Sequence, residues 1–157
     1  MPTDLISLPS APLPDRGLAI GVFDLFHVGH LRYLQYARAR CHTLVALVTP
    51  DATVLARKRR APAMPEHERV EIVQGLGWVD EVRLQPGTLD DTEAALAWLK
   101  ALRVNHVFIG EDWRGSARWE RLAPRIGALG MGLSWTPRAN EVSTTALRER
   151  ILASLHP

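Results

Sequence analysis

One stretch decides the fold of this chain, and it reads Gly21-Val22-Phe23-Asp24-Leu25-Phe26-His27-Val28-Gly29-His30. The apolar run 18–22 that leads into it predicts a buried strand, and the helical spacing of apolar residues behind it predicts a helix that begins near Gly29. Such a junction presents unpaired backbone N–H groups and the positive end of a helix dipole, and both bind anions. His27 and His30 are three residues apart, so their imidazoles should face the same small volume.

The same ten residues resemble the Gly-x-Phe-Asp-x-x-His-x-Gly-His signature of the cytidylyltransferase-like nucleotidyltransferases. The resemblance implies that His27 and His30 donate to phosphate oxygens of a nucleoside triphosphate. It also implies nucleotide-binding positions along the rest of the stretch, at Gly21, Val22, Phe23, Asp24 and Gly29. Two histidines that merely cap a helix are one alternative. A zinc site is another, but the only cysteine is Cys41 and no spacing of Cys or carboxylates completes a ligand set, so we expect no protein ligands for a metal.

The composition is that of a globular protein with one domain. The chain has 157 residues, of which 46% are hydrophobic and 23% charged, so it can bury one core and is not disordered. Its net charge of +2 attracts nucleic acid or a membrane surface only weakly, and we expect neither as a partner. One cysteine, no long apolar stretch and no signal-peptide pattern predict a soluble protein of the reducing cytoplasm.

Strand and helix patterns alternate from Gly17 onward. We predict strands at 18–22, 43–49, 81–84, 106–109 and 131–135, and helices at 29–40, 66–76, 90–102, 116–129 and 143–155. This alternation is typical of a doubly wound, Rossmann-like α/β fold, with one parallel five-stranded sheet and helices on both faces. Ligands of such sheets bind beyond the carboxyl ends of the strands, so the functional motifs should follow strands.

The first sixteen residues are predicted to stand apart from the domain, which we assign to 17–157. Proline is unfavourable in helices and central strands, and this segment contains Pro2, Pro9, Pro12 and Pro14. We interpret 1–16 as an extended, proline-rich arm that lies over the surface or over a partner subunit.

A cationic run follows the second predicted strand and reads Arg57-Lys58-Arg59-Arg60. Such a run by itself is typical of a solvated surface. Its place in a loop after a strand, ended by two prolines, favours a flexible arm that closes over phosphates. Basic residues of this loop contact the triphosphate in the family that the chain resembles. Lys58 is the best match for that role, with Arg59 and Arg60 as alternatives.

The strand 106–109 is followed by Gly110-Glu111-Asp112-Trp113-Arg114-Gly115. This stretch is similar to the Gly-Asp-Asp-Trp-x-Gly stretch of glycerol-3-phosphate cytidylyltransferases. Gly110 would let a ligand approach the strand end, and Asp112 would accept hydrogen bonds from hydroxyls or from an ordered basic side chain. Trp113 would wall the pocket against a base or an acceptor. A surface turn held by a tryptophan is the alternative.

The last motif precedes the last predicted helix and reads Arg138-Ala139-Asn140-Glu141-Val142-Ser143-Thr144-Thr145. Ser143 or Thr144 would cap the helix, and the hydroxyls of its first turn would make another anion seat. The motif resembles the family's Arg-Thr-Glu-Gly-Ile-Ser-Thr-Thr segment, which implies that the triphosphate is held by Arg138, Ser143, Thr144 and Thr145. Residues 139–141 depart from that segment, and Gly77 stands where the glycerol-phosphate enzymes carry an arginine.

The resemblance covers roughly residues 17–150 and is closest to the glycerol-3-phosphate cytidylyltransferases. It implies transfer of a cytidylyl group from CTP to a small alcohol phosphate, by in-line attack and without a covalent enzyme intermediate. The predicted catalytic residues are His27, His30, Lys58 and Arg138. Mg²⁺ would arrive with the triphosphate and be held mainly by phosphate oxygens and water. The family tendency implies a homodimer.

Three other functions agree with part of the sequence. An ATP-dependent adenylyltransferase of a sugar phosphate, FMN or pantetheine phosphate would share the histidine motif and tolerate the changes at 139–141. A class I aminoacyl-tRNA synthetase fragment would share His27-Val28-Gly29-His30, but the chain has no Lys-Met-Ser-Lys-Ser loop and is too short for a tRNA-binding domain. A non-catalytic nucleotide-binding module would explain Gly77 but not the intact histidines.

Overall fold

Strands and helices alternate along the chain in the computed structural model, which describes residues 12–138 and 142–155. The elements are β1 (Arg16–Gly21), α1 (Val28–Arg38), β2 (Thr43–Val48), α2 (Asp51–Lys58), α3 (Glu66–Gln74), β3 (Glu81–Leu84), α4 (Thr92–Ala101), β4 (His106–Gly110), a 3₁₀ helix η2 (Glu111–Trp113), α5 (Ala117–Ala128), β5 (Gly132–Thr136) and α6 (Thr144–Ser154). Most of the predicted arm lies outside the described residues. None of the described helices is long and apolar enough to cross a membrane.

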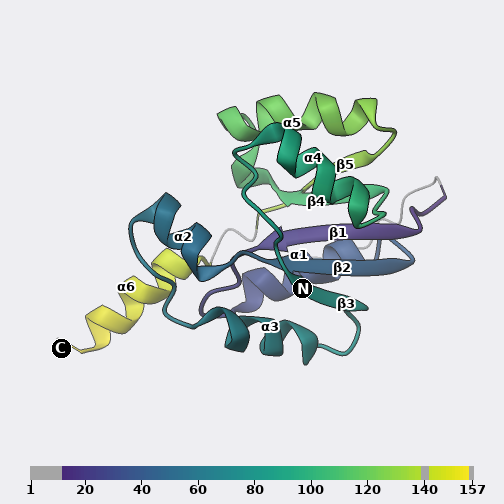
Figure 1. Cartoon of the computed structure of the whole chain (residues 1–157). Helices are drawn as coiled ribbons and strands as arrows, with labels where there is room; N and C mark the ends of the chain where they lie inside the picture. Colours follow the sequence, from purple (N-terminus) through teal and green to yellow (C-terminus); the bar gives the residue numbers. More distant parts are fainter. Residues whose placement is uncertain (1–11, 139–141, 156–157) are drawn as a thin grey trace.

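The five strands form one parallel sheet in the order β3-β2-β1-β4-β5, which confirms the predicted fold (Figure 1). The order reverses between β1 and β4, which pair only from Gly17 with His106 to Ala19 with Phe108. Beyond that point the Tyr33 hydroxyl bridges the two strands in place of direct pairing. It accepts a hydrogen bond from Ile20 N at 3.0 Å and donates one to the Phe108 carbonyl oxygen at 2.8 Å. The two strands therefore part where ligands of this architecture bind.

Two apolar cores form because successive side chains of each strand point to opposite faces of the sheet. Leu18 and Ile20 of β1 face the core that α4 and α5 cover, whereas Ala19 faces the core that α1 and α3 cover. The first core contains Trp119, which is 2% exposed. Figure 1 shows α4 and α5 above the sheet and α3 below it. The prediction of helices on both faces is confirmed.

The α-helix α2 was absent from the prediction. We expected a flexible loop at the cationic run, but Arg57 and Lys58 are the last residues of α2, and Arg59 ends that helix in left-handed backbone with φ of 53°. The helix has only eight residues and buries only Val54. A single buried apolar residue gives no helical periodicity to read, which explains the error.

Candidate active site

His27 and His30 stack against each other at the start of α1. Their ring centroids are 3.8 Å apart and the planes make an angle of 22°. His27 is the N-cap of the helix, and its Nδ1 accepts a hydrogen bond from Gly29 N at 3.0 Å. His30 Nδ1 in turn accepts from His27 N at 3.4 Å. The two imidazoles therefore share one volume, as predicted, and the backbone of one turn orients both rings.

These hydrogen bonds decide which ring nitrogen carries the proton. A neutral imidazole whose Nδ1 accepts a hydrogen bond is protonated at Nε2. Burial and the neighbouring His27 lower the pKa of His30 to about 3, and burial also lowers the pKa of His27. Both rings are therefore neutral near pH 7. Each keeps an Nε2–H donor that has no partner among the described residues, and such donors suit phosphate oxygens.

Phe23 and the glycines of the motif shape the loop itself, and their contacts with a nucleotide stay a prediction. The Phe23 side chain is 1% exposed and packs edge-on against His30, with 5.5 Å between ring centroids. A Cβ atom on Gly21 would lie 2.8 Å from the Phe23 ring, and one on Gly29 would lie 2.8 Å from the His27 ring. The two glycines thus make room for protein rings, and Val22 of the same loop lines a cavity.

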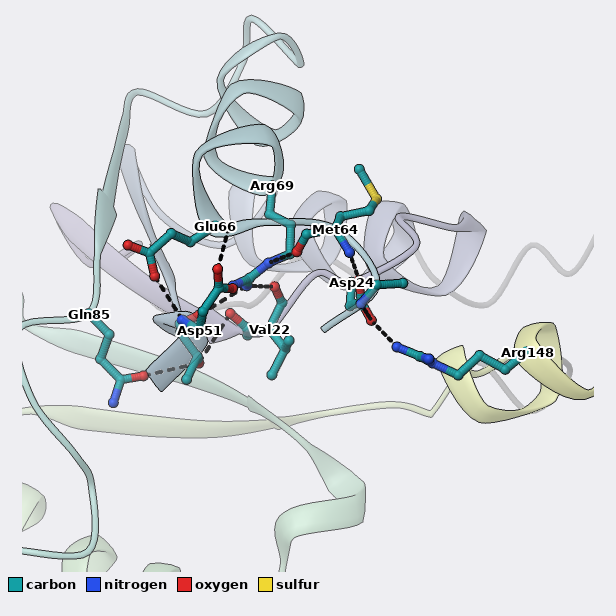
Figure 2. Close-up of polar contacts among 11 residues, drawn as sticks. Val22, Asp24, Asp51, Met64, Glu66, Arg69, Gln85 and Arg148 are labelled. Atoms are coloured by element: carbon teal, nitrogen blue, oxygen red, sulfur yellow. Dashed lines mark hydrogen bonds and ion pairs between the residues drawn. The ribbon is translucent and has the colours of Figure 1, made fainter. Parts of the chain in front are cut away.

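Asp24 is an anchor inside the protein. It is 4% exposed, and its carboxylate accepts from Ala63 N and Met64 N at 2.9 Å each and from Arg148 Nη2 at 2.7 Å (Figure 2). Burial raises the pKa of the carboxyl group, but these hydrogen bonds and the Arg148 charge outweigh burial and hold the pKa below its ordinary value. Protein donors therefore engage both carboxylate oxygens of Asp24, and its contact with a nucleotide stays a prediction.

The tip of α6 reaches the same loop from the other end of the chain. Ser143 caps the helix, and its hydroxyl oxygen accepts from a backbone N–H of the first turn at 3.0 Å. Thr144 Oγ1 donates to the Asp24 carbonyl oxygen, 120 positions away in sequence, at 3.0 Å. The Val142 carbonyl oxygen lies 3.2 Å from where a Cβ atom on Gly29 would be. The predicted convergence of the two motifs is therefore present in the structure.

Arg69 ties three segments of the site together and was missing from the predicted site residues. Its side chain is fully buried. Nη1 donates to the carbonyl oxygens of Val22 and Thr49 at 2.5 and 2.9 Å, and Nε donates to that of Met64 at 3.0 Å. Nη2 pairs with Asp51 Oδ1 at 2.6 Å (Figure 2). One guanidinium thus joins the loop after β1, the end of β2 and the loop before α3.

A sequence signal for Arg69 does exist. It lies four residues before Val73, which is buried, so both residues share the apolar face of α3. An arginine on an apolar face must find partners for its charge inside the protein, and that requirement marks it as structurally engaged.

The carboxylates of Asp51 and Glu66 each accept a hydrogen bond from the first backbone N–H of the other residue's helix. Asp51 N donates to Glu66 Oε2 at 2.7 Å, and Glu66 N donates to Asp51 Oδ2 at 3.2 Å. The N-cap residues of α2 and α3 are Pro50 and Pro65, neither of which offers a capping side chain. The paired carboxylates therefore hold α2, and with it the cationic run, in a fixed place.

A small cavity lies between α2, the loop after β1 and α6, and its charged lining residues are three cations and one carboxylate, whereas His27 and His30 do not line it. The polar side chains that line it belong to Asp24, Lys58, Arg60, Thr144, Thr145 and Arg148. Two members of the cationic run, Lys58 and Arg60, thus reach it. Burial and the neighbouring guanidiniums of Arg57 and Arg60 lower the pKa of Lys58. Cations that are held together in this way favour a polyanionic ligand.

The other predicted ligand segment lies at the ends of β4 and β5. Gly110 ends β4, and Trp113, 39% exposed, has the guanidinium of Arg57 5.2 Å from its ring centroid. Arg138 Nε lies 3.9 Å from Asp112 Oδ1, and both side chains are more than half exposed. Trp113 thus contacts Arg57 of α2, and the next residue of that helix, Lys58, lines the cavity. Arg138 does not line that cavity, and its contact with phosphate stays a prediction.

The donor set suits a magnesium ion that arrives with its own ligands. Within residues 12–138 and 142–155, no group of three or more His, Cys, Asp or Glu side chains could hold a metal ion. The carboxylate of Asp24, which lines the cavity, already accepts hydrogen bonds from Ala63, Met64 and Arg148. A magnesium ion here would therefore be held mainly by phosphate oxygens and water.

Similar proteins include several named FAD synthases. The FAD synthase of Thermococcus onnurineus is 34% identical over 143 residues, which cover 87% of this chain and 91% of that protein. The FAD synthase of Thermococcus kodakarensis is 43% identical over 98 residues, 62% of each chain. These relatives do not support the predicted closeness to glycerol-3-phosphate cytidylyltransferases.

Solved structures share the fold. The lipopolysaccharide core biosynthesis protein of Thermoplasma volcanium matches with a TM-score of 0.62 and 25% identity, over 80% of this chain and 97% of that chain. The pantoate-β-alanine ligase of Francisella tularensis shares the fold alone, with a TM-score of 0.52 and 14% identity over 79% of this chain and 59% of that chain. The family model described as cytidylyltransferase-like matches residues 18–150. This chain therefore belongs to the cytidylyltransferase-like family and is an enzyme of the nucleotidyltransferase type.

Proposed function

We propose that this enzyme transfers the adenylyl group of ATP to FMN and releases pyrophosphate, forming FAD. The observation that carries the proposal is the similarity to the Thermococcus onnurineus FAD synthase over 91% of that protein's length. The cations of the cavity, and the paired neutral imidazoles that follow Asp24 in the same loop, support a triphosphate as one substrate. The proposal replaces CTP and glycerol phosphate, which the motif at 110–115 favoured, with the ATP-dependent alternative.

The reaction is an in-line displacement at the α-phosphorus of ATP. A phosphate oxygen of FMN forms a new bond to that phosphorus while the bond to the bridging oxygen of pyrophosphate breaks, and pyrophosphate leaves with the electron pair. The FMN phosphate is already ionised at neutral pH, so no general base is needed. Catalysis then consists of positioning the two phosphates and of stabilising the charge that moves to the leaving group.

The residues of the site have distinct parts in this proposal. His27 and His30 donate through Nε2–H to oxygens of the α- and β-phosphates. Lys58 and Arg60 attract the outer phosphates, and the hydroxyl of Thr145 adds a donor from α6. Mg²⁺ bound to the triphosphate supplies further positive charge. Arg138 remains a proposed contributor from the end of β5.

Cytidylyl transfer to a small alcohol phosphate is the second candidate. One observation favours it, the Asp112-Trp113 pair directly after β4, where the glycerol-3-phosphate cytidylyltransferases carry the same two residue types. In this candidate the phosphate chemistry is unchanged, and only the base and the acceptor differ.

A matrix of substrates separates the two candidates. The protein is incubated with Mg²⁺ and either ATP or CTP, each with FMN or with glycerol 3-phosphate, while pyrophosphate release is followed and products are separated by chromatography. We expect pyrophosphate and FAD from ATP with FMN only. Release only from CTP with glycerol 3-phosphate would establish the second candidate, and no release from any of the four mixtures would contradict both.

A further inference from the structure

We propose that Arg57 of α2 and Arg118 of α5 bind the phosphate of the acceptor substrate, and that Asp90 is the residue that positions the Arg118 guanidinium. The inference rests on the proposed nucleotidyl transfer, because it needs an acceptor that carries a phosphomonoester. It does not depend on which nucleotide or which alcohol the enzyme uses.

The two guanidiniums meet at the ring of Trp113, the last residue of η2. The Cζ atom of Arg57 lies 5.2 Å from the ring centroid, and the Cζ atom of Arg118 lies 5.7 Å from it. Arg57 belongs to the last turn of α2 and Arg118 to the first turn of α5. Because α2 follows β2 and η2 follows β4, the cluster is built from segments beyond the carboxyl ends of strands, where ligands of this fold bind.

Asp90 holds one of the two guanidiniums in place. Its Oδ1 accepts hydrogen bonds from Arg118 Nε at 2.8 Å and from Arg118 Nη2 at 2.6 Å, and its Oδ2 accepts from the Thr88 hydroxyl at 3.1 Å. The Arg118 side chain is 11% exposed, so it has little freedom to move. Its Nη1 makes no hydrogen bond within the described part of the chain and remains available to a ligand oxygen.

The positive charge of this cluster is not balanced by the protein. Burial and the nearby charge of Arg118 lower the pKa of Arg57. Asp90 is engaged with Arg118, and Arg57 forms no ion pair with residues 12–138 or 142–155. Two cations that share one carboxylate favour an anionic ligand between them.

The cluster is separate from the cavity assigned to the triphosphate. Arg57, Trp113 and Arg118 do not line that cavity, whereas Lys58, the residue after Arg57, does. The charge of Arg57 also contributes to the lowered pKa of Lys58, after burial. The two groups of cations therefore adjoin each other at the end of α2.

Two anionic substrates need two groups of cations. In the proposed reaction an acceptor phosphate with about two negative charges at pH 7 approaches the α-phosphorus of a triphosphate. Repulsion between the two anions opposes that approach. The cations of the cavity offset the charge of the triphosphate, and Arg57 and Arg118 offset the charge of the incoming phosphate. The planar fork of a guanidinium matches phosphate oxygens in geometry as well as in charge.

A purely structural role explains the cluster less well. A contact that served only to dock α2 against α5 would gain from opposite charges, but Arg57 meets a second guanidinium there. The pair of Asp90 and Arg118 already joins α5 to the loop before α4 without Arg57.

The first test compares FMN with riboflavin, which lacks only the phosphate. Binding is followed by flavin fluorescence in the presence of Mg²⁺ and α,β-methylene ATP, whose α–β linkage the reaction cannot break. We expect the wild type to bind FMN about 10- to 100-fold more tightly than riboflavin. Arg57→Gln and Arg118→Gln should each lower this preference about 5- to 20-fold by weakening the binding of FMN alone.

Two further variants and one further titration make the comparison specific. Arg118→Lys should recover part of the preference. The matched control is Arg121→Gln, an exposed arginine of the same helix, which should change the preference less than about twofold. Glutamine variants that keep the full preference for FMN, or that weaken binding of the nucleotide analogue more than binding of FMN, would overturn the proposal.

A wild-type protein without any preference for FMN would contradict the proposed function rather than decide this inference. The same variants are then compared by calorimetry for binding of glycerol 3-phosphate and of glycerol, with Mg²⁺ and α,β-methylene CTP. Loss of the preference for glycerol 3-phosphate in both glutamine variants would leave the inference standing. Equal preference in variants and wild type, or no preference of the wild type for either phosphomonoester, would overturn it.

The role of Asp90 is tested with Asp90→Asn, alone and combined with Arg118→Gln. Removing a negative charge beside a bound phosphate should by itself tighten binding. Weaker binding of FMN by Asp90→Asn, with riboflavin unchanged, would therefore report lost positioning, and the weakening should disappear in the Arg118→Gln background. Tighter binding by Asp90→Asn, or effects of the two substitutions that simply add, would overturn the positioning role.

Discussion

Two regions of this molecule are held together by different forces. The region of α4, α5 and β4 is joined by apolar packing, in which Trp119, Leu122 and Ile126 are almost completely buried. The loops at the carboxyl ends of β1 and β2 are joined instead by Arg69 and Asp24, which bind backbone groups of neighbouring segments. Apolar contacts are non-directional, whereas hydrogen bonds fix atoms in direction and distance. The first region therefore supplies stability, and the second supplies the position of the site.

The largest expected effect is on stability and lies in the apolar region. Trp119→Ala removes a side chain that is 2% exposed and packs against Trp135 with 6.0 Å between ring centroids. We expect the free energy of unfolding to fall by about 3 to 5 kcal/mol, measured by urea denaturation. Below the melting temperature of the variant, its dissociation constant for ATP should equal that of the wild type. If Trp119→Ala lowered the free energy of ATP binding by as much as the free energy of unfolding, the two regions would not differ in the way described.

The next effect lies in the polar region and should reach both properties. Arg69→Met leaves three carbonyl oxygens and the Asp51 carboxylate without their donor, at an expected cost of about 3 kcal/mol in unfolding free energy. Turnover per folded molecule should fall about 100-fold, because the loops that carry the site shift. The control is Arg121→Met, an exposed arginine on α5. A variant that is destabilised but turns over normally would show that the Arg69 network does not position the site.

A smaller effect follows from acidification. The pKa of His30 is about 3 in the folded protein, against an ordinary value of 6.5, so the unfolded chain binds a proton between these values and the folded one does not. The contribution of neutral His30 to the free energy of unfolding is therefore fully present above pH 6.5 and is lost as the pH falls toward 3. Between pH 7 and pH 5 the loss from His30 should be about 2 kcal/mol. The measurement compares urea unfolding of wild type and His30→Asn at both pH values, and identical pH dependence in the two proteins would refute the assignment.

The sequence predicts most of the fold because the strands bury both faces. Leu18, Ala19 and Ile20 are all buried, and a short apolar run between a glycine and an acidic residue leaves few alternatives to a central strand. The short helix α2 could not be predicted in this way. Its one buried residue, Val54, gives no period, and the charges at its end suggested a loop.

The site was predictable only where residue type carries the chemistry. The pairing of His27 and His30 could be predicted from their spacing, and their contact with phosphate stays a prediction. Asp24 and Arg69 act through hydrogen bonds to backbone groups. Every segment of the chain offers such groups, so the sequence does not predict which segments the two side chains bind. Few side chains decide which phosphomonoester accepts the nucleotidyl group. The resemblance of residues 110–115 therefore favours a different branch of the family from that of the FAD synthase relatives.

The central claim is that the paired imidazoles act on phosphates held by the loop after β1 and the tip of α6. The most direct test is single-turnover pyrophosphate release from ATP and FMN by His27→Ala and His30→Ala, below the melting temperature of each variant. We predict rates about 100- to 1,000-fold below that of the wild type, with dissociation constants for ATP that change less than about tenfold. Rates equal to that of the wild type would contradict the account.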